Sequence, residues 1–156
     1  NGGYKIYPKI VLKKYDEDLK EDKFQPLVKN SKNIKIVQDA MFSSTNEVRG
    51  TSYRSRIDDP KYQFAGKTGT AQVKRITKQD RELDLKTLEI PYEERDHALY
   101  VAFGPYRNPR YAISILIEHG GSGSSVAAPI AKKLFKKIID RHQVRKDFNS
   151  KKYLDI

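Results

Sequence analysis

The chain has 156 residues, of which 33% are charged and 37% are hydrophobic, and its formal net charge is +11. Independent globular domains are usually ~45–50% apolar, so this composition is typical of a piece with long solvated loops. The charge would suit nucleic acid or an anionic membrane. However, no basic run is interleaved with aromatic residues spaced for base stacking, so we expect solvated basic faces and no nucleic-acid partner.

The chain contains no cysteine, which excludes a disulfide framework. No stretch approaches the ~18 consecutive apolar residues of a membrane-spanning helix, and the start shows no signal-peptide pattern. If the parent protein is exported, its anchor is expected in a segment absent from this chain.

The first third of the chain is highly charged and contains one predicted helix. Residues 10–12 could form a short strand, and the charge run over 16–23 is typical of an exposed loop. Three- and four-residue spacing then predicts a helix over 33–44, capped by Ser31 or Asn33. Its apolar face would consist of Ile34, Val37, Ala40, Met41 and Ser44.

Three strands are predicted in the next part of the chain. The first runs from Tyr62 to Val73, and alternating apolar residues predict two more over 97–104 and 110–118. A short turn over 105–109 makes the last two antiparallel neighbours. In the charged connection over 74–96, a faint period of two would let part of the segment pair or fold back. It involves Leu83, Leu85, Leu88 and Ile90.

A flexible loop over 120–125 is expected to end in the cap of a long amphipathic helix, with Pro129 in its first turn. Its apolar face would contain Ala127, Ile130, Ala131, Leu134, Ile138 and Ile139, and its opposite face Lys132, Lys133, Lys136 and Lys137. The helix should lie across the sheet.

The predicted fold class is therefore α+β. It consists of a three-stranded antiparallel meander, a long C-terminal helix on its face and a second helix. We expect residues 1–143 to belong to one domain and residues 144–156 to form a polar C-terminal tail.

The first predicted strand carries Lys67-Thr68-Gly69-Thr70. Gly66-Lys67-Thr68 also resembles the end of a phosphate-binding loop, but the first glycine of that motif would fall at Lys61, which excludes it. Lys-Thr-Gly on a strand is a signature of penicillin-recognising serine enzymes, whose companion motifs are Ser-x-x-Lys and Ser-x-Asn.

The companion motifs are not found in their expected form. Ser-x-x-Lys is absent from the sequence. Residues 31–33 match Ser-x-Asn, but they lie at a helix start only 36 residues before Lys67, so we interpret them as a cap. The chain thus looks like one wall of an active site without its nucleophile.

The sequence around this motif and after it resembles that of the class B penicillin-binding proteins, in particular the D,D-transpeptidases of cell elongation. The similar segments are 65–73, 95–98, 102–109 and 118–123. The resemblance extends from residue 1 to about 140 and is specific from 62 to 130. It implies the C-terminal portion of the transpeptidase/β-lactamase-like fold, with the nucleophile and the Ser-x-Asn triplet in a preceding part.

By this resemblance, the parent would be a peptidoglycan D,D-transpeptidase that cross-links stem peptides through a serine acyl-enzyme and is inhibited by β-lactams. It would lie at the periplasmic face of the inner membrane. Its partners would be stem peptides, β-lactams and the N-terminal part of the same domain, with no cofactor. This chain alone should be inactive. The alternative is a non-enzymatic penicillin-sensor or basic binding module on the same fold.

The motif residues have physically reasonable roles in such a site. The Lys67 ammonium suits a substrate carboxylate and would polarise nearby serines, and the hydroxyls of Thr68 and Thr70 lie on one side of a strand and can donate to the same carboxylate. Gly69 would let another backbone approach closely. A bound peptide would add to the strand edge, and the Thr70 N–H would supply half of an oxyanion hole.

Two further expectations concern the rest of the chain. The three histidines are widely separated, so a metal site built from this chain alone is not expected. The strand over 110–118 would present an unpaired edge, which predicts a homodimer or a swapped assembly of the isolated chain.

Overall fold

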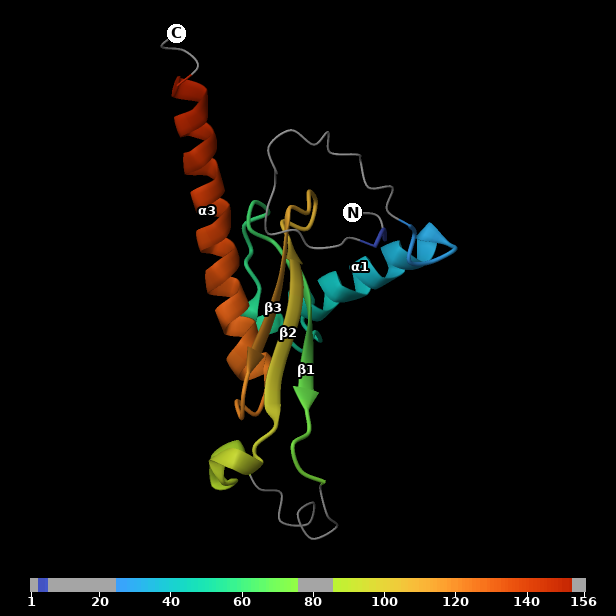
Figure 1. Ribbon diagram of the computed structural model, residues 1–156, viewed down its shortest axis with the longest axis vertical. Helices are drawn as coiled ribbons and strands as arrows, with labels where there is room; N and C mark the ends of the chain where they lie inside the picture. The colour runs from blue at the N-terminus through green and yellow to red at the C-terminus, as the bar shows by residue number, and fades with distance from the viewer. Residues whose placement is uncertain (1–2, 6–24, 76–85, 153–156) are drawn as a thin grey trace, which may run out of the picture. The chain divides into compact units, whose positions relative to one another are not determined.

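The computed structural model describes residues 3–5, 25–75 and 86–152, and the chain divides into two units, residues 1–38 and 39–156 (Figure 1). The predictions for residues 10–12 and 16–23 lie outside the described residues. In the first unit, residues 3–5 run beside residues 25–27: Lys5 N donates to Gln25 O at 2.9 Å and Leu27 N donates to Gly3 O at 2.8 Å.

Helix α1 spans Ser31–Asn46, which confirms the predicted helix over 33–44. The predicted cap is wrong, because the side chain of Asn30 accepts from Lys32 N at 3.0 Å and so satisfies a free amide of the first turn. The predicted apolar face is also wrong in part. Val37 is 54% exposed, whereas the buried residue of α1 is Thr45.

Within the described residues, three antiparallel strands form one sheet in the order β1-β2-β3, as predicted. Strand β1 spans Ala65–Ala71, β2 spans His97–Gly104 and β3 spans Tyr111–Ile117. The register pairs Lys67 with Val101 and Tyr100 with Ile115. Burial alternates along β2, so that every second side chain faces the core.

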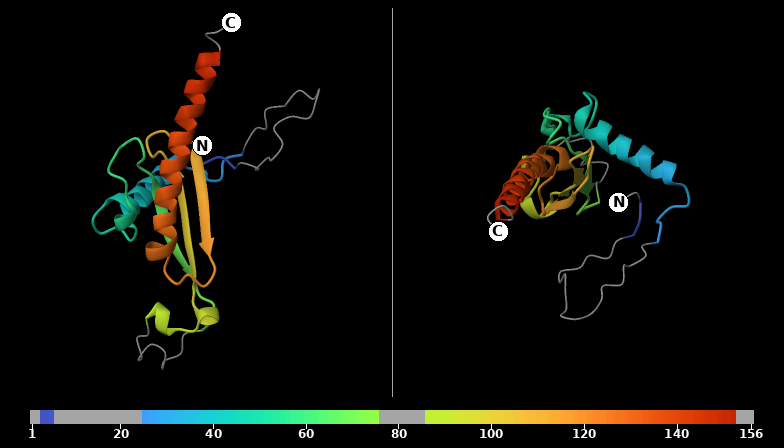
Figure 2. Two further views of the ribbon diagram at one scale, coloured as in Figure 1. Left: turned by 90° about the vertical axis from the view of Figure 1, so that its left-hand side faces the viewer. Right: turned by 90° about the horizontal axis from the view of Figure 1, so that it is seen from above.

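Helix α3 spans Ala128–Lys152 and lies along one face of the sheet (Figure 2). Its predicted contact face is wrong in part: Phe135, which the prediction omitted, is 0% exposed, whereas Ile130 is 36% and Leu134 38% exposed. Phe135 falls seven residues after Ala128, on the stripe that also contains buried Ala131 and Ile139. The four predicted solvent-facing lysines, Lys132, Lys133, Lys136 and Lys137, are exposed.

The core lies between α3 and β2. The Phe64 ring stacks on Phe135 with centroids 4.9 Å apart and meets Tyr100 edge-on at 6.4 Å. The other positions of this core cluster that are at most 4% exposed are all alanines, which allows the helix to approach the sheet closely. They are Ala98, Ala102, Ala127, Ala128 and Ala131.

The connection before α3 is shorter than predicted. Residues Gly123–Ala127 (η4) form a π-helical turn that leads directly into α3, and Ser122 makes no side-chain cap hydrogen bond. The loop predicted over 120–125 therefore ends at Ser122. A Cβ at Gly123 would lie 2.5 Å from both the Gly69 and the Leu99 carbonyl oxygens, so this turn packs directly on the backbone of β1 and β2.

Short 3₁₀ turns complete the described chain: η1 at Tyr53–Ser55, η2 at Thr87–Glu89 and η3 at Tyr92–Glu94. The prediction was that part of this connection pairs or folds back; in the described part, Leu88 lies in η2 and is 84% exposed, so the chain turns here and forms no strand. Lys86 N donates to the Glu89 carboxylate at 2.7 Å, and this local bond favours a turn over an extended strand. Leu83 and Leu85 lie outside the described residues.

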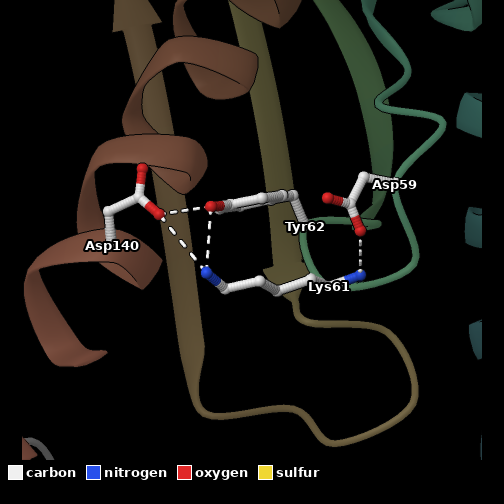
Figure 3. A network of polar contacts seen from close by, with 4 residues as sticks. All are labelled: Asp59, Lys61, Tyr62 and Asp140. Atoms are coloured by element: carbon white, nitrogen blue, oxygen red, sulfur yellow. Dashed lines mark hydrogen bonds and ion pairs between the residues drawn. The ribbon is translucent and has the colours of Figure 1, made fainter.

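A polar cluster joins the segment before β1 to α3 (Figure 3). The Tyr62 hydroxyl donates to Asp140 Oδ1, and Lys61 Nζ lies 3.1 Å from the Tyr62 hydroxyl and 3.6 Å from Asp140 Oδ1. The bond to the Tyr62 hydroxyl raises the pKa of Lys61. Because Asp140 is on the helix, the cluster connects the approach to β1 with the middle of α3.

The architecture of sheet and helices confirms the predicted α+β class. Helix α3 continues to Lys152 and so crosses the predicted boundary at residue 143, while the division into a domain and a tail remains a prediction. Of the helices in the described ranges, none combines the length and apolar character needed to cross a membrane.

Candidate functional site

The four predicted site residues are consecutive on β1, which lies at an edge of the sheet that the described strands form. The carbonyl of Phe64, just before the strand, accepts from Asn46 Nδ2 at 2.9 Å, and the carbonyl of Thr68 accepts from Lys67 Nζ at 2.7 Å. These carbonyls therefore point away from β2. Because peptide groups alternate along a strand, the peptide N–H and C=O of Thr70 are directed to the same outer edge.

The side chains of the motif divide between the two faces of the sheet. Thr68 pairs with Tyr100 and Thr70 with Ala98, both of which are buried on the α3 side. Lys67 instead pairs with Val101, which is 45% exposed. The ammonium and the two hydroxyls thus flank the outer edge of β1 from opposite faces. An extended ligand along this edge would have both kinds of donor within reach.

A buried cluster of hydroxyl groups packs against β1. The Tyr100 hydroxyl lies 2.9 Å from Thr45 Oγ1 and 3.2 Å from Ser52 Oγ. A Cβ at Gly66 would be 2.3 Å from the Tyr100 oxygen, so only glycine fits over this ring. Burial raises the pKa of Tyr100, which keeps its hydroxyl neutral and able to donate.

Thr68 is held by a second set of hydroxyls nearer the surface. Its Oγ1 lies 3.2 Å from Thr51 Oγ1, which in turn lies 3.2 Å from Ser44 Oγ. Ser44 is on the last turns of α1, and Thr51 is in the turn that follows this helix. Hydroxyls on three separate segments are therefore connected at the motif.

The position of a Cβ at Gly69 borders a neighbouring side chain of β2. A Cβ there would have only the Leu99 Cβ nearby, at 3.3 Å. The close backbone approach in this region is that of Gly123, described above. The role of Gly69 in admitting a substrate backbone remains a prediction.

Two of the three histidines lie together. His97 Nδ1 accepts from His119 N at 3.0 Å, and the two rings meet with centroids 4.8 Å apart. His142 contacts Tyr111 and Arg110 instead. Within residues 3–5, 25–75 and 86–152, no group of three or more His, Cys, Asp or Glu side chains could hold a metal ion.

Comparison with known proteins assigns the class. Residues 1–136 match the family model of the penicillin binding protein transpeptidase domain, so the chain belongs to that family. It is 39% identical over 105 residues to the peptidoglycan D,D-transpeptidase MrdA of Salmonella typhimurium LT2, covering 67% of this chain and 16% of that protein. It is 33% identical over 105 residues to MrdA of Escherichia coli K12, with 67% and 15% covered.

Solved structures point to the same relatives. The complex of penicillin-binding protein 2 and MreC from Helicobacter pylori matches with a TM-score of 0.62 and 30% identity, over 78% of this chain and 20% of that chain. Penicillin-binding protein 2 of Pseudomonas aeruginosa, in complex with WCK 5153, matches with a TM-score of 0.55 and 31% identity, over 75% and 22%. The resemblance to class B penicillin-binding proteins, and to penicillin-binding protein 2 among them, is thereby confirmed.

The residues of the buried hydroxyl cluster beside β1, Thr45, Ser52 and Tyr100, were not predicted. Tyr100 lies 55 residues after Thr45 and 48 after Ser52, so no local pattern indicates their contact. The one signal in the sequence was the short Gly-Thr-Ser segment at residues 50–52, which follows α1 after three residues.

Proposed function

We propose that this chain is the C-terminal part of the catalytic domain of a peptidoglycan D,D-transpeptidase, which cross-links stem peptides through a serine acyl-enzyme and is inhibited by β-lactams. The observation that carries the proposal is Lys67-Thr68-Gly69-Thr70 on an edge strand whose outward peptide groups include that of Thr70. An edge strand can bind an extended peptide by main-chain hydrogen bonds.

This placement supports the roles that we propose for the motif residues. Lys67 and Thr70 are proposed as catalytic residues, and Thr68, Gly69 and Thr70 as substrate-binding residues. A stem peptide lying along β1 would have its terminal carboxylate between the Lys67 ammonium and the threonine hydroxyls. The Thr70 N–H would donate to the developing oxyanion, a contribution commonly worth roughly 3–4 kcal/mol.

The rest of the machinery is proposed to lie in the N-terminal part of the same domain. Acylation needs a serine activated by a neighbouring base, and the chain contains no Ser-x-x-Lys. The chain alone should therefore form no covalent adduct with benzylpenicillin, as measured by intact mass. The whole protein is proposed to act at the periplasmic face of the inner membrane, anchored through another segment.

The decisive experiment labels the whole protein with fluorescent penicillin and compares Lys67→Ala with Lys136→Ala. Both variants lose one positive charge, but Lys136 is on the solvent face of α3. Lys67→Ala should reduce the acylation rate at least tenfold more than Lys136→Ala. Equal, modest losses would mean that the basic field matters and not a specific site, which favours the alternative of a non-enzymatic binding module.

The isolated chain is further proposed to self-associate through the outer edge of β3. Strand β3 is at the edge of the sheet formed by the described strands, and exposed strand edges pair readily. Light scattering over a range of concentrations should show a dimer that Ile115→Pro weakens. A monomer at every concentration contradicts this proposal.

A further inference from the structure

The turn that carries Thr51 is fixed to the end of α1. Both the backbone N and the Oγ of Ser52 donate to the Ser44 carbonyl at 3.0 Å, and Gly50 N donates to Glu47 O at 2.8 Å. A Cβ at Gly50 would lie 2.3 Å from the Ser44 carbonyl oxygen, so the close contact requires glycine. Thr51 is therefore presented to β1 by a rigid turn, although its own side chain is exposed.

The hydrogen bonds of this turn permit only certain directions of donation. A hydroxyl has a single proton to donate. If Thr68 donates its proton to a bound anion, its contact with Thr51 must be one in which Thr68 accepts. Thr51 has then used its proton and accepts from Ser44. In the arrangement that satisfies these limits, Ser44 donates to Thr51, Thr51 donates to Thr68, and Thr68 donates to the anion. Hydrogen bonds linked in this way strengthen one another.

We propose that Thr51 is a positioning residue that directs the hydroxyl proton of Thr68 toward the carboxylate of a stem peptide or β-lactam. The inference rests on the proposed function, since it assigns Thr68 a carboxylate ligand. Without Thr51, the Thr68 hydroxyl would be free to rotate, and an anion would have to orient it on binding.

The test measures second-order acylation rates of the whole protein with benzylpenicillin and with its methyl ester, which lacks the negative charge. Thr51→Val removes the hydroxyl at nearly constant volume. It should slow acylation by benzylpenicillin roughly two- to tenfold, the range expected for one hydrogen bond, and leave the rate with the ester within about twofold. Thr51→Ser retains the hydroxyl and should retain the rate with both compounds.

Two further variants complete the design. Ser43→Ala removes a nearby hydroxyl that contacts Glu47 at 2.8 Å and not the motif, and it should have no effect. Adding Thr51→Val to Thr68→Val should cause no further loss, because the hydroxyl that Thr51 orients is already absent.

The outcomes separate this inference from the proposed function. If the wild-type protein is not acylated at all, the proposed function fails and the inference fails with it. If the wild-type protein is acylated, two results overturn only the role of Thr51. Either the Thr51→Val variant is acylated as fast as wild type, or its acylation rate falls by the same factor with benzylpenicillin and with the ester. If Thr51→Val slows acylation in the Thr68→Val protein as much as it does in the wild-type protein, that role is also overturned.

Discussion

The two outer strands of the sheet are held in place by different forces. Strand β3 has large apolar side chains on one face, and Ile115 is 8% exposed beside the core. Strand β1 contains only one side chain larger than threonine, Lys67, and that side chain is exposed. Beyond its pairing with β2, the strand receives hydrogen bonds from outside the sheet, from Asn46 to the Phe64 carbonyl and between Thr51 and Thr68.

The comparison distinguishes the interactions that stabilise the domain from those that position the site. Burial of apolar surface is strong but does not fix orientation, whereas hydrogen bonds contribute less and are directional. Substitutions in the core should therefore change the stability of the whole domain. Substitutions in the polar support should have smaller effects on stability and concentrate them at β1.

The largest effect is expected from Phe135→Ala. This side chain is fully enclosed and stacks on Phe64, so its loss leaves a cavity and should lower the free energy of unfolding by about 3–5 kcal/mol. Leu134→Ala is the matched control, because the neighbouring Leu134 is 38% exposed. Urea denaturation measures both, and similar losses would contradict the assignment of the contact face.

Tyr100→Phe is expected to have the next largest effect. The change keeps the ring and removes the hydroxyl, so Thr45 and Ser52 each lose a partner in a buried place. The free energy of unfolding should fall by about 1–3 kcal/mol. Tyr92→Phe, at a residue that is 59% exposed, should change it by less than about 0.5 kcal/mol. If Tyr100→Phe and Tyr92→Phe change the free energy of unfolding by the same amount, the hydroxyl cluster does not support β1.

Asn46→Ala should have a smaller effect that is confined to one strand. The Asn46 amide donates to the Phe64 carbonyl and also to the Phe42 carbonyl at 3.0 Å. We expect a loss of about 1 kcal/mol, together with faster amide hydrogen exchange at residues 65–68 than at residues 112–116. Uniformly faster exchange in both strands would show that the amide does not act locally.

The smallest effect is the dependence of stability on alkaline pH. Burial raises the folded-state pKa of Tyr100 above its ordinary value of 10.0, so the unfolded chain loses this proton first. Stability from this residue is complete below pH 10 and is lost as the pH rises through the raised pKa. The Tyr100→Phe variant should therefore lose less stability than wild type above pH 10. A parallel loss in both proteins would contradict this.

Periodic patterns predicted the strands well, because alternation along β2 and β3 reflects burial on one face. The same reasoning misplaced the contact face of α3. Ile130 and Leu134 are more hydrophobic than Ala128, but the helix approaches the sheet on its small residues and Phe135. A pattern of hydrophobicity does not record how close two elements come.

The motif on β1 could be recognised from the sequence because its four residues are consecutive. Its polar support was not, because Thr45, Ser52 and Tyr100 come together only when the fold has formed. The cap at Asn30 and the π-helical turn at Gly123–Ala127 were missed for a local reason. Several neighbouring residues, such as Ser31 or Ser125, satisfy the same sequence preference, and the backbone geometry selects among them.

The contact of Gly123 with the backbone of β1 has a consequence for exchanging parts between relatives. No room remains there for even a single methyl group, since its carbon would lie 2.5 Å from the Gly69 oxygen. The π-helical turn η4, which leads into the 25-residue helix α3, thus packs directly on the peptide of one motif residue. A chimaera that imports η4 together with α3 from a relative would shift the Gly69 peptide whenever the new turn lies differently on the sheet, although no imported residue lies on β1.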